Sequence, residues 1–146
     1  MNRVDDGVAR TRLDPDSEDR FVPLRRQLGV TSFGMNQIVL QPGQRGRIHL
    51  HQRQEEVYVV LEGELALVIE GEESAVTVGE LIRVAPGLRR QLVNRGPGRL
   101  VLLALGGDGD HQGRDARAFA SWEDEAGASP QELPLPADLD AGELRH

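Results

Sequence analysis

The stretch GQRGRIHLHQRQEEVYVVLEG, residues 43–63, contains the pattern that decides the fold. Within it, one residue separates His49 from His51, and Glu56 follows after a short polar turn. Side chains alternate between the two faces of a β-strand, so the two imidazoles would point the same way from Cα atoms about 6.6 Å apart. At that separation both rings can reach one cation at bond lengths near ~2.1 Å, and Glu56 could supply a third ligand from the neighbouring strand.

Short apolar segments separated by turn residues recur through the middle of the chain. We predict strands at 32–40, 47–51, 56–61, 64–70, 75–78, 81–84, 90–93 and 100–105, with an edge strand or arm at 21–24 and 28–30. No segment of this core shows sustained helical periodicity, and the pattern indicates an all-β sandwich or barrel. Turn positions that need unusual backbone angles are expected at glycines. These are Gly43, Gly63, Gly79 and Gly87.

Residues 43–63 resemble the first sequence motif of the cupin family. In that motif a Gly is followed after five residues by His-x-His, then by Glu and, six residues later, by a second Gly. The matching residues here are Gly43, His49, His51, Glu56 and Gly63, with every interval kept. The resemblance spans roughly residues 32–106. It implies a single jelly-roll barrel whose His49, His51 and Glu56 bind a metal.

The second cupin motif is matched in its intervals but differs at two residues. Ala85 stands where the family has Pro, with Pro86 one place later, and Arg90 stands where the family has its fourth metal ligand, a His. A guanidinium keeps its proton at ordinary pH and cannot ligate a cation. Arg90 would therefore either bind an anionic group of a ligand beside the metal, or form a bidentate pair with Glu56 in a metal-free site. The matching positions are Gly79, Ala85, Pro86, Gly87, Arg90 and Asn94.

Strand alternation places two further side chains. Tyr58 shares a face with Glu56, so we expect it to line the cavity and bind substrate together with Arg90. Glu55 would point the other way, into solvent. No pair of base and nucleophile can be recognised, so no catalytic residue is assigned.

Charge divides the 146-residue chain, whose net charge is −7, into three parts. Residues 1–20, with six acidic residues and four Arg, are expected to form a flexible N-terminal arm. Residues 21–106, with eight acidic residues and ten Arg, would form the barrel. Residues 107–146, with ten acidic residues and three Arg, would form an irregular acidic extension, with a short helix or wrapping segment at 114–125. The acidic ends argue against nucleic acid as a partner, because phosphate binding needs a basic face.

Other classes of protein are excluded by composition. The chain has no Cys, which rules out disulfides and thiolate metal ligands. It has no apolar run of membrane-spanning length and no apolar leader, so we expect a cytoplasmic protein without a membrane partner. The predicted strands 57–61 and 65–69 are apolar on both faces. The resemblance implies that the outer face is covered in a homodimer; the alternative is a monomer covered by its own C-terminal segment.

Three functions remain open. The first is a metal-dependent enzyme of oxygenase type that acts on an anionic small molecule, with Fe, Mn, Ni or Zn as the divalent transition metal. The second is a metal-free module that binds a small anion or sugar acid without catalysis. The third is a metal-free isomerase or epimerase of acidic or phosphorylated sugars, with a His as base and Arg90 as the anion-binding group.

Overall fold

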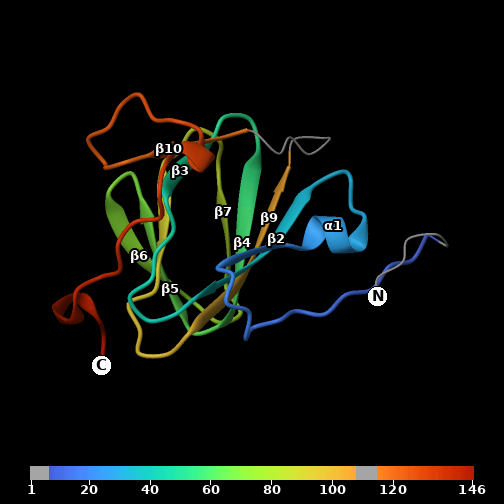
Figure 1. Cartoon of the computed structure of the whole chain (residues 1–146), viewed down its shortest axis with the longest axis horizontal. Helices are drawn as coiled ribbons and strands as arrows, with labels where there is room; N and C mark the ends of the chain where they lie inside the picture. The colour runs from blue at the N-terminus through green and yellow to red at the C-terminus, as the bar shows by residue number, and fades with distance from the viewer. Residues whose placement is uncertain (1–6, 108–114) are drawn as a thin grey trace.

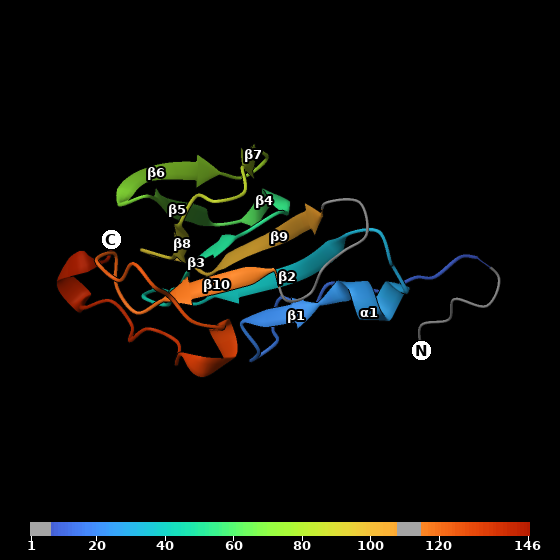
Figure 2. The ribbon, with the colours of Figure 1, turned by 90° about the horizontal axis from the view of Figure 1, so that it is seen from above.

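The computed structural model describes residues 7–107 and 115–146, which form a β-barrel of two antiparallel sheets (Figures 1 and 2). One sheet has the order β1-β2-β9-β4-β7 and the other β10-β3-β8-β5-β6. The strands are β1 (Phe21–Pro23), β2 (Gly34–Leu40), β3 (Ile48–His51), β4 (Glu55–Glu62), β5 (Glu64–Ile69), β6 (Glu72–Thr77), β7 (Leu81–Val84), β8 (Arg90–Val93), β9 (Leu100–Gly107) and β10 (Ala116–Phe119). The helices are α1 (Leu24–Leu28) and the 3₁₀ turns η1 (Pro130–Glu132) and η2 (Ala141–Glu143). The prediction of an all-β jelly-roll barrel is confirmed.

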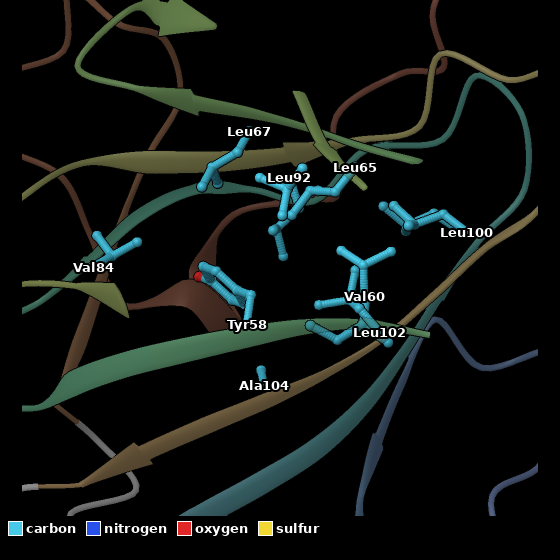
Figure 3. Close-up of a cluster of buried hydrophobic side chains, with 12 residues drawn as sticks. Tyr58, Val60, Leu65, Leu67, Val84, Leu92, Leu100, Leu102 and Ala104 are labelled. Carbon is cyan, nitrogen blue, oxygen red and sulfur yellow. The ribbon is translucent and has the colours of Figure 1, made fainter. Parts of the chain in front are cut away.

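The hydrophobic core lies between the two sheets (Figure 3). It follows from strand alternation, which is clearest in β4. Glu56, Tyr58 and Val60 face inward and are buried, whereas Val57 and Val59 face outward and are half-buried. Burial of a large apolar side chain stabilises the fold by about 1.5–3 kcal/mol. The buried core residues are Ile38, Leu40, Tyr58, Val60, Leu65, Leu67, Val76, Val84, Leu92, Leu100, Leu102 and Ala104.

The strands end at the turns that the glycines predict. Gly43, Gly63, Gly79 and Gly87 all have positive φ, between 81° and 90°. β7 and β8 begin and end at the predicted residues, and the other predicted strands agree with the observed bounds to within a few residues.

The C-terminal part of the chain differs from its prediction. Where a short helix or wrapping segment was expected at 114–125, residues 116–119 form β10, which extends the second sheet by pairing with β3. Beyond β10 lie residues 120–146, which we call the C-terminal strap and which pass in part over the outer side of this sheet (Figure 2). Trp122, Leu139 and Leu144 of the strap pack against Ala66, Val68 and Val93. The apolar outer face of the second sheet is therefore covered by the chain itself.

The N-terminal residues 7–20 run along the first sheet. The main chain of Asp14 exchanges two hydrogen bonds with the buried side chain of Gln37, N–H to Oε1 at 2.6 Å and Nε2 to C=O at 2.8 Å. Of the two segments expected as an edge strand or arm, 21–24 contains β1, whereas 28–30 forms no strand and begins at the last residue of α1. α1 has five residues and is the longest described helix; none of the described helices is long and apolar enough to span a membrane.

Candidate functional site

β3 carries both predicted histidine ligands on the inner face of the barrel. His49 lies opposite Arg90 of β8 on one side and Ala118 of β10 on the other, and His51 lies opposite Ala116. Directly opposed residues of antiparallel strands project to the same face. The small side chains of β10 therefore leave room for the imidazoles, whose ring centroids are 5.3 Å apart.

Glu56 approaches the two imidazoles from β4 in the facing sheet. Its Oε2 lies 3.3 Å from Nε2 of His51, and its Oε1 lies 3.8 Å from Nε2 of His49. One ligand atom from each residue lies within 4.8 Å of the other two. Ligand atoms that share an ion at ~2.1 Å lie about 3.0–3.4 Å apart at octahedral or tetrahedral angles. His49, His51 and Glu56 could therefore hold a metal ion after small side-chain adjustments.

A backbone carbonyl behind the ring of His49 orients this imidazole for metal binding, whereas His51 has no hydrogen bond at the corresponding nitrogen among the described residues. Nδ1 of His49 lies 3.1 Å from the carbonyl oxygen of Arg47. A proton on Nδ1 would be donated to this carbonyl, so that Nε2 is the nitrogen that faces Glu56 and can bind a metal when it carries no proton. Nδ1 of His51 lies 3.8 Å from Oδ2 of Asp115, which is too long for a hydrogen bond.

Asp115 is a buried carboxylate beside the site that the sequence did not indicate. It accepts hydrogen bonds from the backbone N–H of Arg53 at 3.1 Å and of Gln54 at 2.9 Å. These bonds hold the turn between β3 and β4, and thus the relative placement of His51 and Glu56. Asp115 follows a polar segment and lies far from the motif in sequence, so no local pattern identifies it.

The carboxyl of Glu56 has the ionised form that a cation requires. Burial raises its pKa, but the facing His49 and His51 lower it more, so the pKa lies well below its usual range. The hydroxyl of Tyr58 donates a hydrogen bond to Oε1 of Glu56. Burial raises the pKa of Tyr58 well above its ordinary value, and the negative charge of Glu56 adds to this, so the hydroxyl keeps its proton and remains a donor.

Arg90 lies inside the barrel but is sealed off from solvent. Its exposed fraction is 0%, and one terminal nitrogen, Nη2, donates to the carbonyl of Ala85 at 3.2 Å. Its Nε and Nη1 have no hydrogen-bond partner among the described residues. The alternative in which Arg90 pairs with Glu56 is not observed, because Glu56 instead contacts the two histidines and Tyr58.

A cavity of about 370 Å³ opens onto the three candidate ligands. Tyr58 lines it, as the strand pattern predicts, whereas Arg90 does not. Arg47 and Gln131 are polar lining residues that the sequence did not indicate. Arg47 nevertheless precedes His49 by two residues, a spacing that sends both side chains to the same face of a strand. The remaining lining residues are Phe21, Asn36, Ile38, Gly46, Leu92, Ala104, Ala116 and Pro130.

Comparisons with known proteins agree with this architecture. Residues 36–106 match the sequence profile of the cupin domain. No curated protein sequence matches the chain. Among solved structures, a sugar phosphate isomerase of the cupin superfamily from Silicibacter pomeroyi is similar at 24% identity, covering 87% of this chain and 98% of that one, with a TM-score of 0.63.

Two further structures share the fold. A cupin protein from Bacteroides fragilis is 22% identical over 69% of this chain and 84% of its own, with a TM-score of 0.61. A protein with a double-stranded β-helix domain from Klebsiella pneumoniae is 15% identical over 75% of this chain and 92% of its own, with a TM-score of 0.58. Residues 36–106 thus match the cupin-domain profile, and the likenesses to the solved structures show the same fold.

Proposed function

We propose that the protein binds a divalent transition metal through His49, His51 and Glu56, and that the cavity beside the metal takes up a small anionic molecule. The observation that carries this proposal is the convergence of three ligand atoms, all within 4.8 Å of one another, on a cavity of about 370 Å³. Two imidazoles and one carboxylate suit Fe, Mn, Ni or Zn.

The proposed activity is an oxygenase-type reaction. A metal held by three protein ligands keeps open positions for small molecules and supplies Lewis acidity or redox chemistry with dioxygen. The chain's own residues would orient the ligands: the Tyr58 hydroxyl holds Glu56, and the carbonyl of Arg47 holds the His49 ring. Apolar lining residues such as Ile38 and Leu92 would exclude water from the reacting molecule.

A second candidate is a metal-free cupin that binds an anion, either without catalysis or as an isomerase or epimerase. The specific observation in its favour is Arg90, whose cationic group is buried inside the barrel with two nitrogens unpartnered among the described residues. Arg90 does not line the cavity, so its buried positive charge would oppose a metal ion and favour an anion at a distance rather than by contact. The structure from Silicibacter pomeroyi shares the fold and is described as a sugar phosphate isomerase, so sugar phosphates belong among the ligands to be tested.

Elemental analysis of untagged protein tests the first proposal. We expect about one transition-metal ion per wild-type chain, and loss of this metal in His49→Ala and Glu56→Gln. His146→Ala is the matched control, because His146 is exposed at the end of the chain. If the wild-type protein remains metal-free after incubation with Fe, Mn, Ni and Zn, the metal proposal is wrong and the second candidate takes its place.

The protein is also proposed to form a homodimer through the outer face of the first sheet. Val59 of β4 lies between Leu81 of β7 and Leu103 of β9 on this face. A groove on the same face is lined in part by Phe33, Val57 and Leu105, and both Phe33 and Leu81 are exposed. The C-terminal strap covers the other sheet, so a second copy is the partner that would bury these apolar side chains.

A further inference from the structure

Arg47 is the arginine that a molecule in the cavity would meet. It lines the cavity and is half-buried, whereas Arg90 is fully buried and is absent from the lining residues. Arg47 precedes His49 by two residues, so both side chains leave the strand region on the same side, from Cα atoms roughly 6.6 Å apart. A molecule of a few carbon atoms could therefore contact both the candidate metal ligands and the Arg47 guanidinium.

No carboxylate among residues 7–107 and 115–146 forms an ion pair with Arg47. Its Nε instead donates a hydrogen bond to the carbonyl oxygen of Leu133, at 2.8 Å. By contrast, Arg83, Arg89 and Arg99 each form an ion pair with a Glu. The terminal nitrogens of Arg47 can thus donate to an oxyanion, for which a planar guanidinium has matching geometry.

The C-terminal strap holds the side chain of Arg47 in place and also contributes residues to the wall of the cavity. Leu133, which accepts the hydrogen bond from Nε, directly follows η1, and Pro130 and Gln131 of η1 line the cavity. The carbonyl of Leu133 restricts the rotation of the guanidinium, while the amide of Gln131 offers a further donor and acceptor. A neutral carbonyl orients Arg47 without cancelling its charge, which suits a binding group better than a structural ion pair would.

We propose that Arg47, oriented by the carbonyl of Leu133, binds the oxyanion group of the ligand and thereby selects small carboxylates or phosphates over neutral molecules. Gln131 completes this polar wall. The inference rests on the proposed uptake of an anionic molecule, but it does not depend on whether a metal is bound.

Titration calorimetry with D-gluconate, D-glucose 6-phosphate and neutral D-glucose tests the proposal. We expect at least one anion to bind the wild-type protein and glucose to bind more weakly. Arg47→Gln should weaken binding of that anion about tenfold or more, and Arg47→Lys should restore part of the loss. Which anion binds distinguishes a carboxylate ligand from a phosphate.

Arg45→Gln is the matched control for a merely structural role of Arg47. Nε of Arg45 also donates to a carbonyl of the strap, that of Ala137 at 3.0 Å, but Arg45 does not line the cavity. We expect this variant to bind the anion like the wild-type protein. Equal loss in both variants would assign Arg47 to anchoring of the strap and overturn the proposal, as would unchanged binding by Arg47→Gln or failure of both anions to bind the wild-type protein.

Metal content of the same variants separates this inference from the metal proposal. Arg47→Gln should retain the metal content of the wild-type protein, whatever that is, because its side chain is not a candidate ligand. Anion binding that depends on Arg47 in a protein that holds no metal would support the inference and contradict the metal proposal.

Discussion

At the scale of single residues, position 90 offers a direct test of the metal site. The main chain of Arg90 pairs with that of His49, so a side chain at this position starts beside the first histidine on the inner face. Arg90→His removes a cation and adds an imidazole, and we expect it to tighten Zn²⁺ binding about tenfold or more. Calorimetry measures the affinity. Arg90→Gln is the control, since it removes the charge without adding a good ligand; equal affinity of the two variants would mean that residue 90 does not reach the ion.

Gly63 provides a residue-scale test of the turn that follows β4. It has φ +81°, and a Cβ atom there would lie 2.4 Å from the carbonyl oxygen of Arg99. Gly63→Ala is therefore expected to lower the free energy of unfolding by about 3 kcal/mol or more, through strain and overpacking together. Chemical denaturation measures the change.

Gly71→Ala separates the two causes. Gly71 has φ +86°, but a Cβ atom there would have no neighbour within 4 Å. This variant should lose about 1–2 kcal/mol from backbone strain alone. An equally small loss in Gly63→Ala would show that the chain near Arg99 moves aside.

Local spacing predicts where a side chain starts better than what it contacts. The interval from Gly79 places Arg90 on the inner face, and the register of β8 with β3 agrees. The sealing of its guanidinium depends on the surrounding core, which no spacing rule describes. For Arg47 too, the sequence predicts the face to which the side chain projects, because it lies two residues before His49. Its position in the cavity wall, however, depends on a hydrogen bond to Leu133, 86 residues away.

At the scale of elements, strands with strong apolar character were predictable and β10 was not. Leu81–Val84 and Arg90–Val93 have the expected bounds because turn residues frame short apolar runs. Ala116–Phe119 has the sequence ARAF, with weak strand propensity, and becomes a strand because it pairs with β3. Its two alanines lie opposite His49 and His51 and leave room for the imidazole rings. This pairing cannot be predicted from the local sequence of either strand.

The edge strand β6 carries an ion pair whose strength should depend on pH. The hydrogen bond from Arg95, at 2.6 Å from Nη2 to Oε1, lowers the pKa of Glu73 below its usual value of about 4.5. Because the folded state has the lower pKa, this pair stabilises the fold above about pH 4.5, and the contribution disappears as the pH falls through the folded-state pKa. Its size should be less than about 1 kcal/mol, since both side chains are partly exposed.

Glu73→Gln is expected to destabilise the protein slightly at pH 7, with a difference from the wild-type protein that shrinks below about pH 4.5. Thermal denaturation as a function of pH measures this. Glu72→Gln, on the same strand but with no ion pair among the described residues, should show a smaller effect at pH 7. A difference that grows on acidification would contradict the assignment.

At the scale of the whole molecule, the two sheets differ in how their outer faces are covered. The C-terminal strap packs against the second sheet through Trp122, Leu139 and Leu144. Arg95 adds a link by donating both to Glu73 and to the carbonyl of Glu143 in η2. Residues 7–20 and α1 cover part of the first sheet, around Gln37, and leave the side near β7 open. The sequence shows that one strand of each sheet, 57–61 and 65–69, is apolar on both faces, but not which outer face the chain covers itself.

The open part of the first sheet leads to the prediction on assembly. Leu81 is 66% exposed on the edge strand β7, next to Val59, so Leu81→Glu can be accommodated in a folded monomer. We expect light scattering after size exclusion to give twice the chain mass of 16.0 kDa for the wild-type protein and a monomer for Leu81→Glu. A charge buried without a partner at the centre of an apolar interface would oppose association strongly.

The control for this experiment is Leu135→Glu, an exposed leucine of the strap between Leu133 and Ala137, whose carbonyls accept hydrogen bonds from Arg47 and Arg45. It introduces the same charge away from the proposed interface and should leave the dimer intact. Dissociation by both variants would indicate a general effect of charge on association rather than an interface at β7. A monomeric wild-type protein would contradict the dimer but leave the cavity proposals untouched, because His49, His51, Glu56 and Arg47 come together at the cavity within a single chain.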